Sequence, residues 1–514
     1  MSRLLKNESP ATCALPWPQQ RRNLILFAVC TGMQYLAAPV LYVGITQASL
    51  CDSLGANART SNLPGTLFFA MTAMPALFAW LSPRVSSLKR NLSLFYGASA
   101  LMLASLAVTL ALPVSNQFKL AMIVLQGGVS GAVMPAAIAL LWEAMVRGSD
   151  ESRRGLALSM AFGAAPLLAV VGSFGQTALM GGNLFGWKFT GLEYPTNFII
   201  LFAAGAPVMG LVAVFSQFFV IAPVEHEQSR EPISSVIGLL IGLPLMFAAV
   251  ALMHFSSVPD KASTEALSSA SLLTGNELRA AGGFCAFGAA LAFIYHFRSI
   301  LQHRVLLIAT IVTILIYAGN VIPSNMNLYT TEAVGDLPLD WAGIQNMLRF
   351  SFKVVAGAML GWVLTRTNPK VGILATSSIF LAAQVWAIFV TGPWYLVASG
   401  LHGAGELVGV YAPNYIVCAS RRDQLRRNMA FVTMLMVPAA PAGYLYGAIV
   451  DGVKQAGWTA FGMNSTSLGF RLSFLVCGLL ILSGILLAVL LLPAKPRPAS
   501  PVSPVGRENL PGKL

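Results

Sequence analysis

Long apolar stretches recur along the whole chain, and they constrain the fold more than any other feature. A helix needs about 20 mostly apolar residues to cross the hydrocarbon core of a bilayer. By this criterion the sequence predicts an all-α membrane protein with about fourteen transmembrane helices, with twelve as the alternative because the eighth span is short and rich in Gly and Ala. The predicted spans are residues 23–49, 63–81, 91–112, 118–142, 155–180, 196–222, 233–255, 278–297, 305–322, 341–365, 371–391, 394–419, 428–450 and 470–492.

The composition agrees with a membrane bundle. Of 514 residues, 56% are hydrophobic and only 10% are charged, whereas soluble domains carry about 25% charged residues. A soluble core of this size would leave too little polar surface to cover itself, so the apolar residues must face lipid. The six cysteines form no C-x-x-C pair. No metal site, disulfide framework or cofactor is therefore predicted.

The Lys and Arg residues are concentrated in alternate loops between the predicted spans. With the N-terminus placed inside, the cytoplasmic segments collect most of the Lys and Arg, which is the positive-inside pattern. The bias holds to the end of the chain, so both termini are expected in the cytoplasm and the protein in the inner membrane. The net charge of +13 is then a topology signal and not a nucleic-acid footprint. The predicted outer segments hold only Arg59, Lys119, Lys188, Lys261, Arg279 and Lys454.

Two sets of six spans resemble each other. A basic loop follows the second span of each set, SPRVSSLKR in the first and TRTNPK in the second, and Pro135 and Pro413 occupy matching helices. Matched features lie about 275–280 residues apart. Parallel repeats of six helices are a standard transporter design. The expected organisation is a cytoplasmic segment (1–22), a six-helix half (23–222), a linker with two extra spans (223–304), a second half (305–492) and a disordered cytoplasmic tail (493–514).

Degenerate motifs accompany the repeat. The loop TRTNPK, with Gly361 before it, keeps Arg366 and Lys370, whereas Thr365 stands where an acid would complete the pattern G-x-x-x-D-R-x-G-R-K. The first-half loop keeps only basic residues, Arg84, Lys89 and Arg90. On the fourth span, Gln126 and Gly127 remain of an Arg-x-x-Gln-Gly pattern, with Ile123 in place of the arginine.

With these motifs and its two repeats, the sequence resembles the major facilitator superfamily in its fourteen-helix form, over about residues 23–492. The resemblance implies two six-helix halves that alternate around a central site. It also implies a gating role for the basic loop residues Arg84, Arg90, Arg366 and Lys370. Glu143 and Arg147, one turn apart at the inner end of the fourth span, are expected to form a surface or gating pair.

Four ionisable residues stand inside apolar spans, where charge is costly and usually serves a pathway or a partner. Arg349 and Lys353 lie four residues apart on the tenth span, and His402 and Glu406 lie four apart on the twelfth. Residues four apart share one helix face. Counting inward, Arg349 and His402 reach one depth and Lys353 and Glu406 another, which predicts a central site for an anionic group. The alternative is an ion pair that only joins two helices.

Other polar residues are weaker candidates for lining the same cavity. They are Gln34 and Tyr35 on the first span, Gln126 on the fourth and Asn320 on the ninth. For each, the alternative is an interhelical hydrogen bond, which contributes roughly 0.6 kcal/mol on average.

The sequence as a whole favours a secondary transporter that moves a small, anionic solute by alternating access, with coupling to protons left open. No Walker or zinc motif occurs, so transport driven by ATP is not expected of this chain alone. The chain is expected to be monomeric in the bilayer and not to be an enzyme. The alternative is a membrane-embedded enzyme or a non-transporting sensor. An enzyme would show clustered acids, His or Cys near one interface, and a sensor would carry a sizeable soluble domain.

Overall fold

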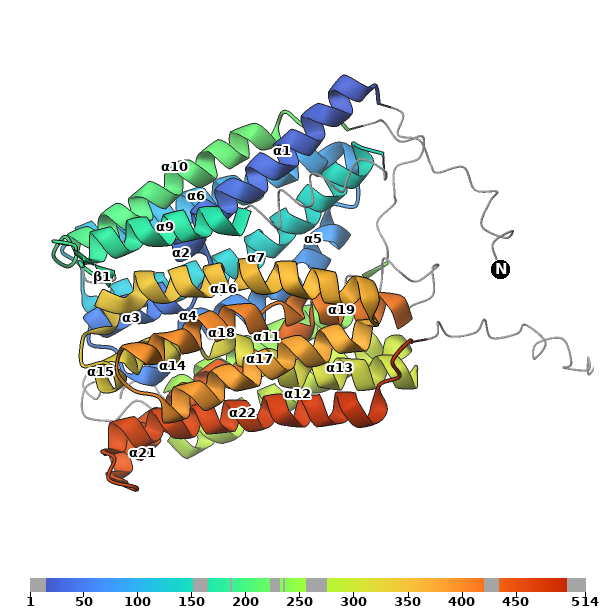
Figure 1. Ribbon diagram of the computed structural model, residues 1–514. Helices are drawn as coiled ribbons and strands as arrows, with labels where there is room; N and C mark the ends of the chain where they lie inside the picture. Colours follow the sequence, from blue (N-terminus) through green and yellow to red (C-terminus); the bar gives the residue numbers. More distant parts are fainter. Residues whose placement is uncertain are drawn as a thin grey trace, which may run out of the picture.

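The computed structural model describes residues 15–150, 165–184, 187–221, 232–233, 236–255, 275–419 and 434–496. Within them the chain is a bundle of long helices that run roughly parallel (Figure 1). Helix α1 (Trp17–Leu36) begins, and α22 (Ser465–Leu491) ends, at the same end of the bundle, on the right in Figure 1. We call this the proximal end and the opposite one the distal end. An even number of spans places both ends of the described chain together in this way.

The first set of spans contains the following helices after α1. They are α2 (Ala38–Leu41), α3 (Ile45–Ser53), α4 (Ala58–Ala70), α5 (Met74–Leu81), α6 (Leu88–Ala111), α7 (Asn116–Arg147), α9 (Ala165–Met180) and α10 (Thr196–Ser216). Short 3-10 turns, η1 (Met71–Ala73) and η2 (Val85–Ser87), precede α5 and α6. Two-residue strands, β1 (Asn183–Leu184) and β2 (Trp187–Lys188), pair antiparallel between α9 and α10.

A middle pair, α11 (Ile237–Phe255) and α12 (Gly275–Leu301), precedes the second set. That set contains α13 (Arg304–Tyr317), η6 (Ala318–Val321), α14 (Pro323–Leu328), α15 (Thr330–Ala333), α16 (Pro338–Arg366), α17 (Pro369–Phe389), η7 (Pro393–Leu396), α18 (Val397–Gly405), α19 (Val408–Ala419), η9 (Met434–Met436), α21 (Pro441–Ala456) and α22.

These elements match the fourteen predicted spans and confirm the fold class. Among the described residues, nine helical runs are long and apolar enough to cross a membrane. The other five predicted spans correspond to α1–α3, α9, α16, α18–α19 and α21. Residues 155–164 of the fifth predicted span and 428–433 of the thirteenth lie outside the described residues. The eighth predicted span, described as short and rich in Gly and Ala, is the 27-residue α12.

Three spans predicted as continuous helices are broken. The first is interrupted around Gly44, whose φ of 150° only glycine adopts readily. The ninth tightens into η6 before Pro323, which has no N–H to donate, and then continues as α14. The twelfth is interrupted at Glu406, between α18 and α19. The breaks at Gly44 and Glu406 lie within spans whose hydropathy is high on average, so hydropathy did not reveal them.

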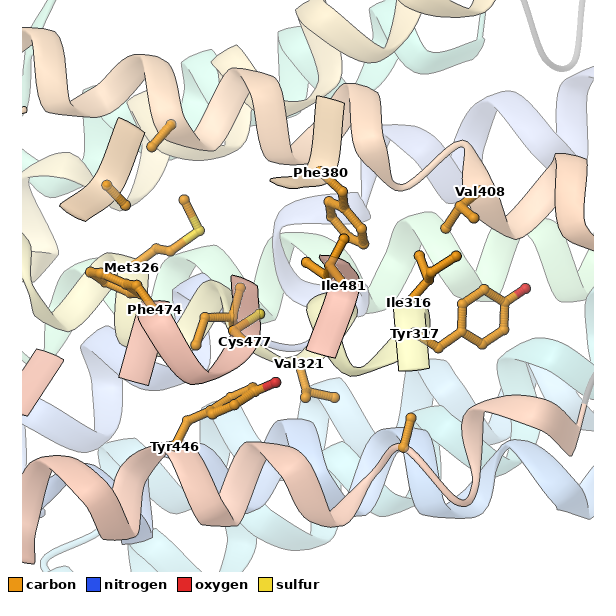
Figure 2. Close-up of a cluster of buried hydrophobic side chains, with 14 of the residues drawn as sticks. Ile316, Tyr317, Val321, Met326, Phe380, Val408, Tyr446, Phe474, Cys477 and Ile481 are labelled. Atoms are coloured by element: carbon orange, nitrogen blue, oxygen red, sulfur yellow. The ribbon is translucent and has the colours of Figure 1, made fainter. Parts of the chain in front are cut away.

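The two sets keep the predicted repeat. Helix α4 begins at Ala58 and α16 at Pro338, which differ by 280 residues, and α6 and α17 begin at Leu88 and Pro369, which differ by 281. Each set has its own apolar core. Figure 2 shows part of the second core, where Phe380 and Ile481 point toward one another. There Tyr446 donates its hydroxyl to the carbonyl of Ala318 at 3.1 Å.

The halves meet where α4 packs on α21, where α9 packs on α16, and where α3 packs on α14 and α16. Glycines permit the approach. A Cβ on Gly447 of α21 would lie 2.6 Å from the carbonyl oxygen of Ala58, and one on Gly343 of α16 would lie 2.3 Å from Oγ1 of Thr177. The middle pair packs across this junction, because a third apolar cluster joins α11 and α12 to α4, α5 and the η9–α21 segment.

Candidate functional site

The four ionisable residues singled out in the sequence lie together. Arg349 and Lys353 project from α16 to Glu406, which occupies the break between α18 and α19. The Nε of Arg349 donates to Oε1 of Glu406 at 2.9 Å, its Nη2 also donates to Oε1, and Lys353 Nζ donates to Oε2 at 2.5 Å. His402 Nε2 lies 3.4 Å from the same carboxylate. Instead of two pairs at two depths, both cations and the imidazole share one acid.

Glycines of α18 bring the acid to the cations. A Cβ on Gly403 would lie 1.9 Å from the carbonyl oxygen of Arg349, and one on Gly400 would lie 2.8 Å from the ring of Phe352. Only the absence of side chains at these two positions lets α18 lie directly on α16. The helix then ends at Gly405, and Glu406 follows within reach of both cations.

The site carries more positive than negative charge, because two cations face one carboxylate. The side chain of Arg349 is 7% exposed and that of Glu406 is 10% exposed. Among the described residues, Arg349 Nη1 has no hydrogen-bond partner, although it is buried. A buried donor without an acceptor is costly, and more so when it is charged. An additional acceptor with negative charge would satisfy Nη1 and balance the site.

Aromatic side chains from both halves surround these cations. The ring of Phe350 on α16 lies 6.2 Å from that of Tyr35 on α1 and 6.0 Å from that of Tyr42, which follows α2. The Cζ of Arg349 lies 5.7 Å, and the Nζ of Lys353 lies 5.5 Å, from the centroid of Phe350. The charged cluster therefore lies next to the boundary between the halves, and Tyr35 contacts Phe350 there.

Buried amides join the halves one turn from Arg349. Asn346 of α16 donates to Oε1 of Gln176 on α9 at 3.0 Å and to Oγ1 of Thr46 on α3 at 3.3 Å. Gln176 in turn donates to Thr46 at 3.1 Å. Sequence reasoning missed these residues, as well as Tyr42 and Phe350. The available signal was an amide within an apolar span, which applies to both Gln176 and Asn346.

Further hydrogen bonds join the two halves at the distal end. Ser49 of α3 donates to Oδ1 of Asn327 on α14 at 2.7 Å, and Asn62 of α4 donates to Oδ1 of Asn325 at 2.7 Å. Asp451 of α21 accepts the backbone N–H groups at the start of α4. The broken helices α3 and α14 therefore meet at the distal end, between the charged cluster and that surface of the bundle.

The other predicted cavity residues bond mainly within their own half. Gln34 donates to the hydroxyl of Tyr96. Gln126 donates to Ser130 at 3.0 Å and accepts from Gln47 at 3.2 Å. Asn320 lies in η6 and is 6% exposed. The bonds of Gln34 to Tyr96 and of Gln47 to Gln126 join different helices, as the alternative from the sequence describes, whereas that of Gln126 to Ser130 lies within α7.

The predicted gating residues lie at the proximal end. Glu143 and Arg147 form an ion pair on α7, with Nε and Oε1 2.7 Å apart. Lys370 donates to the carbonyl oxygens of Val489 and Leu492, each at 2.8 Å, and so caps the end of α22 within its own half. Arg84 and Arg90 are exposed. Arg366 ends α16, and its side chain lies outside the described residues.

Comparison with known proteins relates the fold to solved transporters. No model of a protein family matches the chain, and no curated protein matches it. The structure is similar to the nucleoside transporter NupG, with a TM-score of 0.57 and 10% identity over 90% of this chain and 99% of that one. It is also similar to the POT family transporter PepTSo (0.56, 15% identity, 92% and 98% covered) and to an auto-inhibited POT family peptide transporter (0.58, 14%, 94% and 99%). At such identities the likeness shows the fold, which is of the major facilitator type.

Proposed function

We propose that this chain is a secondary active transporter of the major facilitator type that moves a small anionic solute across the inner membrane. The observation that carries the proposal is the cluster in which Arg349 and Lys353 share Glu406, with an unpartnered guanidinium nitrogen. A buried ion pair that served only to join helices would gain little stability. A second cation on the same carboxylate adds further desolvation cost, which a binding site for an anion explains.

The solute's acidic group would bind Arg349 and Lys353 beside the ring of Phe350. A carboxylate or phosphate suits the guanidinium, which offers paired donors to two oxygens. Tyr35 and Tyr42 contribute contacts from the other half, so a bound solute would contact both halves at the same time. The fold supports the transport part of the proposal, because the similar solved structures are nucleoside and peptide transporters.

Alternating access would then exchange one set of contacts between halves for another. In the present arrangement the distal contacts, such as Ser49 with Asn327, are made. Opening the distal end requires those bonds to break, while the solute stays on the charged cluster. Rocking of two six-helix halves around a central site is a mechanism available to this architecture.

Proton coupling would run through Glu406. When the solute anion occupies Arg349 and Lys353, the carboxylate loses part of its cationic environment and can accept a proton. When the solute leaves, the carboxylate returns to the cations and releases that proton. His402, 3.4 Å from Oε1, is placed to relay it. A pH gradient should then drive uptake into proteoliposomes, and Glu406→Gln should abolish the dependence on the gradient.

The remaining expectations from the sequence stand as part of the proposal. The protein would be monomeric, with both termini in the cytoplasm, and the distal end would then face outward. The halves would be residues 23–222 and 305–492, with the middle pair in 223–304 as an added unit.

The first test is ligand-induced thermal stabilisation of purified protein against anionic, neutral and cationic metabolites. A ligand at 100 times its Kd adds about 2.7 kcal/mol. We expect an anion to stabilise the wild type and Lys495→Ala, a matched change of an exposed lysine, but not Lys353→Ala. Stabilisation by neutral or cationic compounds alone, or an equal response of Lys353→Ala, would overturn the anion site.

Transport itself is tested with the ligand found in that screen. We expect the labelled anion to accumulate in proteoliposomes that contain the wild type and to stay outside those that contain Lys353→Ala. Binding without accumulation would favour the alternative, a non-transporting sensor. Chemical conversion of the ligand would favour a membrane-embedded enzyme.

A further inference from the structure

An apolar cavity lies away from the charged cluster, where both halves meet the middle pair. Its volume is about 290 Å³, and it is lined by α4, α7, α11 and the start of α21. Of the twelve lining residues, only Thr66 and His254 carry polar side chains. Two others, Ala251 and Pro441, are exposed, so the cavity opens at the side of the bundle. We call it the lateral slot.

The lateral slot is unsuited to water. Apolar cavities of about 150 Å³ stay dry and bind apolar molecules instead, and this one is larger. Because α4, α7 and α11 are membrane-spanning, the medium at its mouth is lipid hydrocarbon. An unfilled space would cost the lining its dispersion contacts, so an acyl chain is the occupant that both the lining and the surroundings select.

One lining residue, Thr66, has a hydroxyl that a ligand could satisfy. Thr66 is 2% exposed, and its hydroxyl has no hydrogen-bond partner among the described residues. It lies eight residues beyond Ala58, where α4 begins at the distal end, a distance of about 12 Å along the helix. In a bilayer with a hydrocarbon core of about 30 Å, this depth belongs to the leaflet on the distal side. A lipid ester carbonyl or a fatty carboxyl can accept from a hydroxyl placed there.

We propose that the lateral slot binds one acyl chain of a lipid from the distal leaflet, with its ester carbonyl accepting a hydrogen bond from Thr66. At the distal side of the slot, Tyr444 donates to the carbonyl of Met253 at 3.2 Å and its ring lies 6.3 Å from that of His254. These polar groups are suited to the part of the lipid nearest its headgroup. Since the lining comes from both halves and the middle pair, the bound chain stabilises the distal-closed arrangement.

Photo-crosslinking in nanodiscs tests the site directly. The probe is a phosphatidylcholine with a diazirine in one acyl chain, and the readout is the modified residue found by peptide mass spectrometry. We expect labels on residues 63–70 of α4 and 246–254 of α11. Val250→Trp fills the slot and should lower this labelling at least fivefold. Ile241→Trp, on the exposed face of the same helix, should leave it unchanged.

Labelling of the slot that stays at background, or that persists in Val250→Trp, would overturn the proposal. Should Val250→Trp fail to fold, Ala251→Phe blocks the exposed mouth and makes the same test. Labelling at Phe287 of α12, a side chain that is 64% exposed, reports ordinary contact with bilayer lipid and should be equal in all variants.

Thr66→Val tests the polar contact at nearly constant volume. If the ester accepts from Thr66, this variant should retain severalfold less lipid than the wild type in native mass spectrometry. Equal retention would overturn the hydrogen bond. Added lipid should also raise the Tm of the wild type in detergent and not that of Val250→Trp, whereas an equal shift in both would contradict binding at the slot.

Discussion

Asp451 of α21 accepts the backbone N–H of Ala58 at 3.1 Å, so a carboxylate of one half caps a helix of the other. The same carboxylate accepts the N–H of Arg59 at 3.0 Å, and its Oδ2 lies 3.6 Å from Arg59 Nε. A negative charge at a helix N-terminus is favoured both by the free N–H groups and by the helix dipole. In the proposed transport cycle this contact would break when the distal end opens, so it would stabilise the closed state.

Asp451→Asn should open the distal end more often. Hydrogen bonds to charged groups contribute about 1.5–3 kcal/mol, and about 1.4 kcal/mol is a factor of ten. We expect the rate at which a membrane-impermeant maleimide modifies Ser49→Cys to rise about tenfold. Asp336→Asn, a change of an exposed acid, is the control. Equal rates in the three proteins would contradict the cap.

Gly447→Ala should also weaken the packing of α21 on α4. Here the cause is the volume of a new methyl group and not the loss of a charge. The new Cβ would lie 2.6 Å from the carbonyl oxygen of Ala58, which is backbone and cannot move alone. We expect faster maleimide modification of Ser49→Cys and a lower Tm. Gly452→Ala is the matched control on the same helix, because a Cβ there meets nothing within 4 Å. A similar response of both variants would exclude a specific close contact.

The charged cluster should respond unequally to the loss of its members. Glu406→Gln leaves two cations without their acid, and an uncompensated buried charge costs about 3–5 kcal/mol. Lys353→Met leaves one cation, Arg349, paired with one anion, Glu406, so the remaining charges cancel. Thermal unfolding in detergent should therefore place Glu406→Gln well below Lys353→Met. The opposite order would mean that the carboxylate is not the centre of the cluster.

Lys370→Ala should affect stability more than transport. Its ammonium group caps two carbonyl oxygens at the end of α22, and a cation at a helix C-terminus contributes about 0.3–1 kcal/mol. We expect a small fall in Tm and an unchanged rate of solute uptake. If Lys370 instead latches one conformation, as the family resemblance implies, uptake and maleimide access would both change, while Lys495→Ala would change neither.

The spans and the repeat could be predicted because lipid imposes simple rules on sequence. A helix that faces hydrocarbon must be apolar over its whole length. Basic residues in the loops indicate which end of each helix faces the cytoplasm. The breaks at Gly44 and Glu406 could not be read in this way. Each depends on a local backbone conformation and on a helix packed beside it, and neither lowers the average hydropathy of its span enough to end it.

The charged part of the site was also accessible, since Arg349, Lys353 and Glu406 are conspicuous within apolar helices. Counting depth predicted two pairs at two depths and gave no rotation about the helix axis, so it did not show that both cations reach one acid. Tyr42 and Asn346 escaped notice for a related reason. Aromatic and amide residues are common in spans, and which of them face the other half depends on packing between distant segments.

The glycines at the crossing of α4 and α21 have one more consequence. Where Gly443 and Gly447 face Thr66 and Ala58, the backbone of α21 lies close against α4. In the proposed transport cycle this crossing would be the place where the two halves pivot on each other. A larger side chain at Gly447 and a neutral one at Asp451 would then shift the same equilibrium by different routes, the first through steric overlap and the second through a lost charge.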